Sequence, residues 1–215
     1  MNDASSEILA GISEVRGGLY NLTMSAIAIP KLTVDEYLAV DRLAERGSDY
    51  HDGAVIQREP GTWSHAVISA RVGSRLCAAL DGRRCGVANS SVRVRVSPSN
   101  FVYPDLVIVC GQPEFIDLER DTITNPKVIV EVLSPTTAGY DYGGKFGFYR
   151  RLPSFEEYLL VAHDEPRIDV FHKAPDGRWI LTSYEGQDAI VRVESLDIAI
   201  PLAEIYVDAT QETQA

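Results

Sequence analysis

The sequence predicts an α/β protein built as a single domain around a mixed sheet flanked by helices. Residues 106–110, 128–133 and 157–162 form three runs that are apolar on both faces, which is typical of central strands in a covered sheet. Between them and the N-terminus, apolar residues recur at helical spacing, namely Ile68, Val72, Leu76 and Leu80. A chain of 215 residues is long enough for one sizeable core and too short for two.

The domain is expected to span residues 30–208. Residues 1–29 are an expected N-terminal extension with little order, because Gly17 and Gly18 interrupt a weak helical pattern there. Residues 209–215 are expected to form a C-terminal tail. We assign no chemistry to the extension.

Helix and turn signals define the first part of the domain. Thr33 and Glu36 form a capping box at the start of a helix that we expect Gly47 to end. Asp52–Gly53 predicts a hairpin turn between two short strands. A second helix is expected from about Trp63, after a loop.

The second part of the domain is expected to be richer in strands. Valines alternate with Arg93 and Arg95 over residues 87–96, which predicts one half-exposed strand with an arginine face. A helix is expected over residues 142–152, ended by Pro153, with Lys145 and Tyr149 on one face. The remaining expected elements are a hairpin over 167–184, short strands at 189–193 and 196–200, and a final turn at 202–206.

The composition limits the classes of function. The formal net charge is -11 and the sequence pI is about 4.8, which argues against a protein that coats duplex DNA through a broad basic face. Local contact with nucleic acid through a few arginines, metal ions or a partner stays open.

The cysteines and the apolar runs bear on location. The sequence has three cysteines, Cys77, Cys85 and Cys110. Because their number is odd and no CxxC motif is present, we expect reduced thiols rather than a disulfide or a zinc site. No apolar run reaches the ~20 residues of a membrane helix, and the N-terminus lacks a secretory signal. We therefore expect a cytoplasmic protein that does not engage a membrane.

Two carboxylates lie in or beside the apolar strands. In residues 128–133 alternate side chains face opposite sides, which places Glu131 among apolar neighbours. A buried carboxylate without a partner costs several kcal/mol or takes up a proton. Asp105 opens the neighbouring apolar run, so both acids could converge on one magnesium or manganese ion, which prefers oxygen ligands.

Simpler interpretations stand beside this one. An acid at a strand end is commonly solvated or caps a loop, and this applies most to Asp105. His65, in the first turn of its helix, is more often a local hydrogen-bonding residue than a ligand. Arg71 and Arg75 lie off the apolar stripe and fit solvated helix charges, with phosphate contact as the alternative.

With these residues in place, the chain resembles the Uma2 family of restriction-endonuclease-like proteins within the PD-(D/E)xK nuclease superfamily. The resemblance covers about residues 31–207. It is carried by residues 103–109 (Tyr-Pro-Asp-Leu-Val-Ile-Val), 130–137 (Val-Glu-Val-Leu-Ser-Pro-Thr-Thr), 141–145, Tyr149 and 157–161. The Glu-Val-Leu-Ser-Pro segment with its trailing lysine and tyrosine is a fairly specific signal, whereas Pro-Asp alone is weak.

The resemblance implies a restriction-endonuclease-like fold and metal-dependent hydrolysis of phosphodiester bonds in nucleic acid, with DNA as the expected substrate. By position, Asp105, Glu131 and the backbone carbonyl of Val132 would bind magnesium or manganese. Asp49 falls where the family more usually has a glutamate, and His65 falls where related sequences also have a histidine. Many nucleases of this fold dimerise, so a homodimer is an expectation of the same kind.

One departure from the superfamily pattern concerns the lysine. Its usual place, two residues after the glutamate, is Leu133, and Lys145 on the following helix is the natural replacement. Tyr149 could hold Lys145 or contact a phosphate, or be a core aromatic. Two other classes stay open: a catalytically inactive or partner-dependent module with the same fold, and a purely structural domain whose acids pair with Arg93, Arg95 or Arg150.

Overall fold

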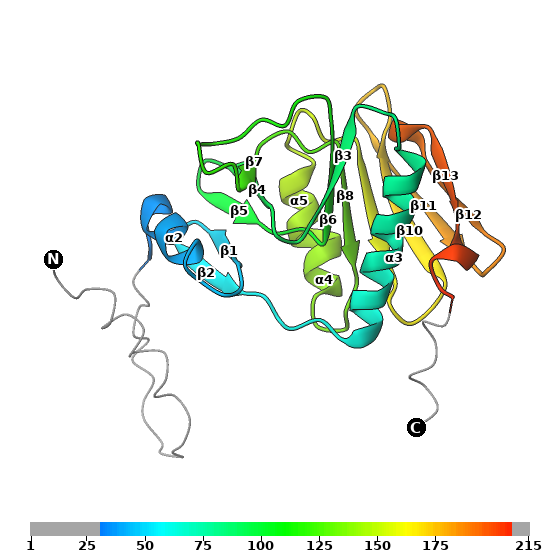
Figure 1. The fold of residues 1–215 in the computed structure, drawn as a ribbon, viewed down its shortest axis with the longest axis horizontal. Coiled ribbons are helices and arrows are strands. Elements are labelled where there is room, and N and C mark those ends of the chain that lie inside the picture. The colour runs from blue at the N-terminus through cyan, green and yellow to red at the C-terminus, as the bar shows by residue number, and fades with distance from the viewer. Residues whose placement is uncertain (1–30, 208–215) are drawn as a thin grey trace, which may run out of the picture. The chain divides into compact units, whose positions relative to one another are not determined.

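A computed structural model describes residues 31–207 of the chain. The expected extension at 1–29 and tail at 209–215 lie outside the described residues. The expected mixed α/β architecture is confirmed (Figure 1). No helix in the described part is long and apolar enough to cross a membrane.

The larger sheet of residues 31–207 has six strands in the order β11-β10-β9-β8-β6-β3. β8 pairs with β9 in parallel, and the other pairings are antiparallel. The strands are β3 (Cys85–Asn89), β6 (Leu106–Cys110), β8 (Val128–Val132), β9 (Glu157–Val161), β10 (Arg167–Lys173) and β11 (Trp179–Glu185). β8 and β9 are buried at every position, as expected of central strands covered on both faces.

A five-stranded sheet of the described residues has the order β2-β1-β5-β4-β7. Its strands are β1 (Ser48–His51), β2 (Ala54–Gln57), β4 (Arg93–Ser97), β5 (Asn100–Val102) and β7 (Thr122–Ile123). The expected hairpin at Asp52–Gly53 joins β1 to β2, with both turn residues at positive φ. A third sheet pairs β12 (Ile190–Val193) with β13 (Ile198–Pro201); short 3-10 turns follow each of these two strands, at Glu194–Leu196 and Leu202–Glu204.

Different elements cover the two faces of the larger sheet. The buried stripe of α3 (Trp63–Ala79) packs with Val128, Val130 and Val132 of β8 and with β12 and β13. Ile129 and Leu133 face the other way, toward α4 (Ala138–Tyr140), α5 (Phe146–Tyr149) and the second sheet. The expected alternation of β8 is therefore confirmed, and Glu131 belongs to the face covered by α5.

The first helix of the described residues, α2 (Val34–Asp41), has the expected capping box between Thr33 and Glu36. The helix ends at Asp41 rather than at Gly47. Instead, Gly47 lets the chain pass the ring of Tyr103, since a Cβ there would lie 2.5 Å from that ring.

The single strand expected over residues 87–96 is wrong. The chain forms β3 and β4, separated by a turn, and the two strands belong to different sheets. Arg93 is not on an exposed face: it is 1% exposed and pairs with Asp41 at 3.0 Å and with Asp121. The alternation of valine and arginine did not reveal this burial, because it depends on the pairing of Arg93 with acids distant in sequence.

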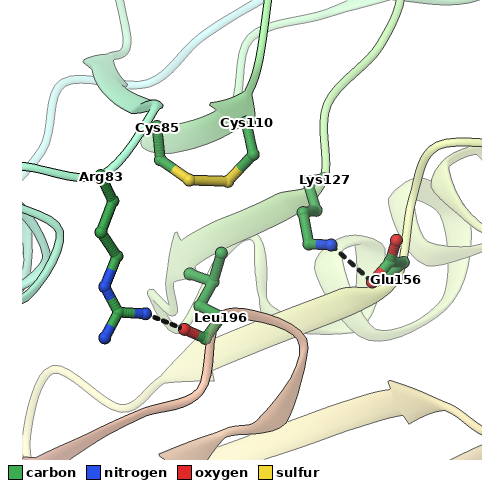
Figure 2. The surroundings of a disulfide bond; sticks show 6 residues. All are labelled: Arg83, Cys85, Cys110, Lys127, Glu156 and Leu196. Carbon is green, nitrogen blue, oxygen red and sulfur yellow. Dashed lines mark hydrogen bonds and ion pairs between the residues drawn. A yellow bond between two sulfur atoms is a disulfide. The ribbon is translucent and has the colours of Figure 1, made fainter.

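The expectation that all cysteines are reduced is also wrong. Cys85 and Cys110 form a disulfide (Figure 2). Cys77 is free and exposed. The two bonded residues lie opposite one another on the antiparallel strands β3 and β6, with their Cα atoms 4.0 Å apart. Such a contact depends on the register of two strands and cannot be read from an odd number of cysteines.

Candidate active site

Asp105 and Glu131 lie close together, Asp105 at the start of one strand and Glu131 within the neighbouring strand. Asp105 immediately precedes β6, and β6 pairs with β8, which carries Glu131. The backbone N–H of Asp105 lies 3.4 Å from Glu131 Oε2, and the backbone N–H of Val132 donates to Asp105 Oδ2 at 2.8 Å. The structure therefore brings together the two acids that the sequence singled out.

Lys145 reaches Glu131 from the helical segment that follows β8. Its Nζ lies 3.0 Å from Glu131 Oε1 and 3.1 Å from Asp141 Oδ1. Residues Asp141–Lys145 form a π-helical turn between α4 and α5, and this turn places Asp141 and Lys145 against the strand. Lys145, fourteen residues after Glu131, therefore contacts the glutamate, whereas Leu133 packs in the core.

Tyr149 lies behind Glu131. The side chain is fully buried, and its hydroxyl donates to Glu131 Oε1 at 3.0 Å. The sequence did not predict this contact between Tyr149 and Glu131. Tyr149 fixes the rotamer of Glu131 while its ring packs in the core.

His65 and Asp49 complete the set of expected residues. His65 Nε2 lies 3.2 Å from Asp105 Oδ2, so the histidine contacts the acid directly. Asp49 is 4% exposed and accepts a hydrogen bond from the backbone N–H of Tyr103 at 2.9 Å. Asp49 lines the same cavity as the other acids, and among the described residues it forms no ion pair with a basic side chain.

The three acids expected at the site differ in the direction of their pKa shifts. Burial raises the pKa of Glu131 to about 8, even though Lys145 opposes that shift. Burial also raises the pKa of Asp49. For Asp105 burial acts in the same direction, but His65, the N–H of Val132 and Lys145 together outweigh it and lower the pKa of the acid.

The pKa values of both basic residues at the site are raised. Burial disfavours the ammonium of Lys145, but Glu131, Asp141 and Asp49 outweigh it and raise the lysine pKa. The hydrogen bond to Asp105 raises the pKa of His65. At neutral pH the site therefore holds a charged lysine beside a glutamate whose ionisation is held back by burial.

The site opens into a cavity of about 1020 Å³. Asp49, His65, Asp105, Glu131, Asp141 and Lys145 line it, together with hydroxyl-bearing residues such as Thr62, Ser134 and Thr136. A concave site that gathers charged groups with shifted pKa values is the usual form of an active site.

The donor set suits a divalent cation of the magnesium type. Among residues 31–207, Asp105 Oδ1 has no closer ion-pair partner than Arg58 at 3.9 Å, and Glu131 Oε2 has only the 3.4 Å contact to a backbone N–H. Within residues 31–207 no three His, Cys, Asp or Glu side chains form a ready-made metal site. Two carboxylate oxygens, a main-chain oxygen and waters fit such an ion, which keeps part of its hydration.

The cavity is also lined by three residues to which the sequence patterns assign no role: Asp141, Tyr140 and Arg58. Asp141 is 1% exposed and pairs with Lys145 four residues later, so an acid and a lysine at this spacing were the available signal. Tyr140 lines the cavity, and its hydroxyl contacts His51. Arg58 also lines the cavity, but no sequence pattern distinguished it from a surface arginine.

Together the fold and the site define a restriction-endonuclease-like α/β protein. One acid precedes a central strand, the other lies in the adjacent strand, and a lysine comes from the next helical segment. The family model Uma2, described as "Putative restriction endonuclease", matches residues 34–203. The chain belongs to this family, as the resemblance predicted.

Two relatives and one solved structure are similar to the chain. Two uncharacterized proteins of Synechocystis sp. are similar to the chain: slr1290 is 34% identical over 178 residues, covering 82% of this chain and 92% of the relative. The other, sll1609, is 31% identical over 177 residues, covering 81% and 100%. A crystal structure of a "putative nuclease belonging to DUF820" from Anabaena variabilis has the same fold, with a TM-score of 0.65 at 18% identity, covering 81% of this chain and 97% of that one.

Proposed function

We propose that the protein is a metal-dependent endonuclease that hydrolyses phosphodiester bonds of nucleic acid, with DNA as its substrate. The observation that carries this proposal is the meeting of Asp105, Glu131 and Lys145 at one cavity. Membership of a family described as restriction endonucleases supports the reaction class.

In this proposal, magnesium or manganese is held by Asp105, Glu131 and the backbone carbonyl of Val132. When bound, such an ion lowers the pKa of a coordinated water and offsets charge on the phosphate. The chain's own part is to present oxygen donors in fixed positions. His65 and the N–H of Val132 hold Asp105 Oδ2, and Tyr149 and Lys145 hold Glu131 Oε1.

Lys145 has the second role. Its ammonium is fixed by Glu131 and Asp141, and it would stabilise the negative charge that builds on the phosphate or orient the attacking water. Asp49 adds negative charge near Lys145 and helps to keep the lysine protonated. A homodimer would provide two such sites for cutting two strands, and this belongs to the proposal as well.

The test is a cleavage assay on supercoiled plasmid and on single-stranded DNA with magnesium or manganese. Lys145→Met should lose at least 100-fold in cleavage rate, on the scale of losing one electrostatic donor, while its metal affinity stays close to that of the wild type. Lys127→Met is the matched control, because Lys127 pairs with Glu156 away from the site. Equal rates for wild type and Lys145→Met would reject the assigned role.

A second candidate is a binding module that keeps the fold without chemistry. Leu133 at the usual lysine position and the net charge of -11 favour it. The same assay separates the two: metal binding by the wild type without cleavage of any nucleic acid supports the module, and metal-dependent cleavage supports the enzyme.

A further inference from the structure

Arg58 is an arginine of the cavity whose position is fixed by the protein. It follows β2, and its Nη1 donates to the backbone carbonyl of Ser90 at 3.3 Å. Its guanidinium lies over the ring of Tyr103, 5.3 Å from the ring centre. The side chain is 23% exposed, so these contacts hold it within the wall of the cavity rather than in solvent.

Two donor groups of this guanidinium are left without a protein partner. Among the described residues, neither Nε nor Nη2 of Arg58 makes a hydrogen bond, and the contact from Nη2 to Asp105 Oδ1 is 3.9 Å, too long for one. Nε–H and one Nη–H group form a planar fork that matches two oxygens of a phosphate. Because Arg58 lines the cavity, this edge can take an anionic ligand there without giving up a protein contact.

Arg58 is not needed as the partner of Asp105. That acid already has His65 Nε2 at 3.2 Å and the N–H of Val132 at 2.8 Å. Lys145, the other fixed cation of the site, uses its ammonium on Glu131 and Asp141. In a chain with a net charge of -11, Arg58 is thus a positioned cation with unused donors beside the acid pair.

We propose that Arg58 binds a phosphate group of the nucleic-acid strand through its Nε–Nη2 edge, next to the Asp105–Glu131 pair. The inference rests on the proposed nuclease function and specifies how the substrate is held. The anchor on Ser90 and the ring of Tyr103 orient the fork, so that little side-chain entropy is lost on binding.

The experiment measures equilibrium binding of a labelled single-stranded oligodeoxynucleotide with calcium replacing magnesium, so that binding is read without cleavage. Arg58→Gln should weaken binding roughly 10-fold to 100-fold, as expected for charge-assisted hydrogen bonds. The salt dependence of its binding should correspond to about one phosphate contact fewer. Arg58→Lys keeps the positive charge but loses the planar pair of donors. Its affinity for the oligonucleotide should lie between those of the wild type and Arg58→Gln.

Arg84→Gln is the matched control, because Arg84 is exposed, carries the same charge and does not line the cavity. Thermal unfolding of each variant shows whether loss of the Ser90 contact affects folding, and Arg58→Lys serves if Arg58→Gln is unstable. If Arg58→Gln and Arg58→Lys bind as the wild type does, the inference is overturned while the nuclease proposal stands. If the wild type binds no oligonucleotide, both fall together.

Discussion

Glu131 shows at the scale of one residue how the site departs from an ordinary core. It lies in a fully buried strand and keeps one oxygen for Lys145 and Tyr149. Burial still raises its pKa to about 8, so the protein alone does not compensate its charge. A residue kept at such a cost is typical of a functional site.

This predicts how the stability of the metal-free protein depends on pH. The folded-state pKa of Glu131 lies above the ordinary value of 4.5, so protonated Glu131 stabilises the folded state relative to the unfolded chain. This contribution to the free energy of unfolding is fully present below about pH 4.5 and is lost as the pH rises through about 8. Glu131→Gln keeps an oxygen for Lys145 and Tyr149 but does not titrate. Urea unfolding in EDTA between pH 5 and 9 should show the wild type losing stability relative to the variant, by up to about 1.4 kcal/mol per pH unit. Parallel curves would contradict the burial of an uncompensated acid.

At this scale the sequence predicted the acids but not all of their partners. Glu131 and Asp105 were identifiable because carboxylates next to apolar strands are costly. His65 and Tyr149 were expected near the site, and both contact the acids. Arg58 could not be predicted, because its role depends on Ser90 and Tyr103, which are distant in sequence.

The π-helical turn at Asp141–Lys145 is the element that shapes the site. It lies between α4 and α5, so helical structure runs over residues 138–149 rather than the expected 142–152. The turn contains Gly143 and Gly144. A Cβ on Gly144 would lie 2.5 Å from the ring of Tyr140, whose hydroxyl is tied to His51.

Gly144→Ala should therefore destabilise the protein by about 1–3 kcal/mol, as overpacking does, and reduce activity by displacing Lys145. Gly143→Ala is the control on the neighbouring residue: its Cβ would meet nothing within 4 Å, and the substitution should be neutral or stabilise by about 0.4–1 kcal/mol. Chemical denaturation of both variants measures the difference. Equal stability of the two would show that Tyr140 can move aside without cost.

Elements with local signals were predicted well. The capping box, the buried stripe of α3 and the hairpin of β10 and β11 needed only neighbouring residues, and all are confirmed. The π-turn and the division of residues 87–96 into β3 and β4 were not predicted, because they follow from contacts with Glu131 and between sheets.

Across the whole described molecule, the chain passes directly from one sheet to the other at the site. Tyr103, Pro104 and Asp105 join β5 of the five-stranded sheet to β6 of the larger one. The disulfide ties β6 to the edge strand β3. The fold class was predictable from the apolar runs, whereas the order of short strands in the second sheet depends on tertiary pairing.

Loss of the disulfide should be felt by the whole molecule. Cys110→Ser opens a loop with a sequence separation of 25 and should lower the free energy of unfolding by about 3 kcal/mol in the chain-entropy account. Cys77→Ser, which changes a free and exposed cysteine, should have little effect. Thermal unfolding with and without reductant tests this: reductant should lower the Tm of the wild type and leave that of Cys110→Ser unchanged. A wild type insensitive to complete reduction would contradict the prediction.

The proposed nuclease activity depends most on the binding of one divalent cation by Asp105 and Glu131 together. The most direct measurement is calorimetric titration of manganese into the wild type, Asp105→Ala and Glu131→Ala, with Asp176→Ala as a control at an exposed turn. We expect the wild type and Asp176→Ala to bind manganese, and Asp105→Ala and Glu131→Ala each to lose manganese binding. Unchanged binding in both site variants, or no binding by the wild type, would contradict it.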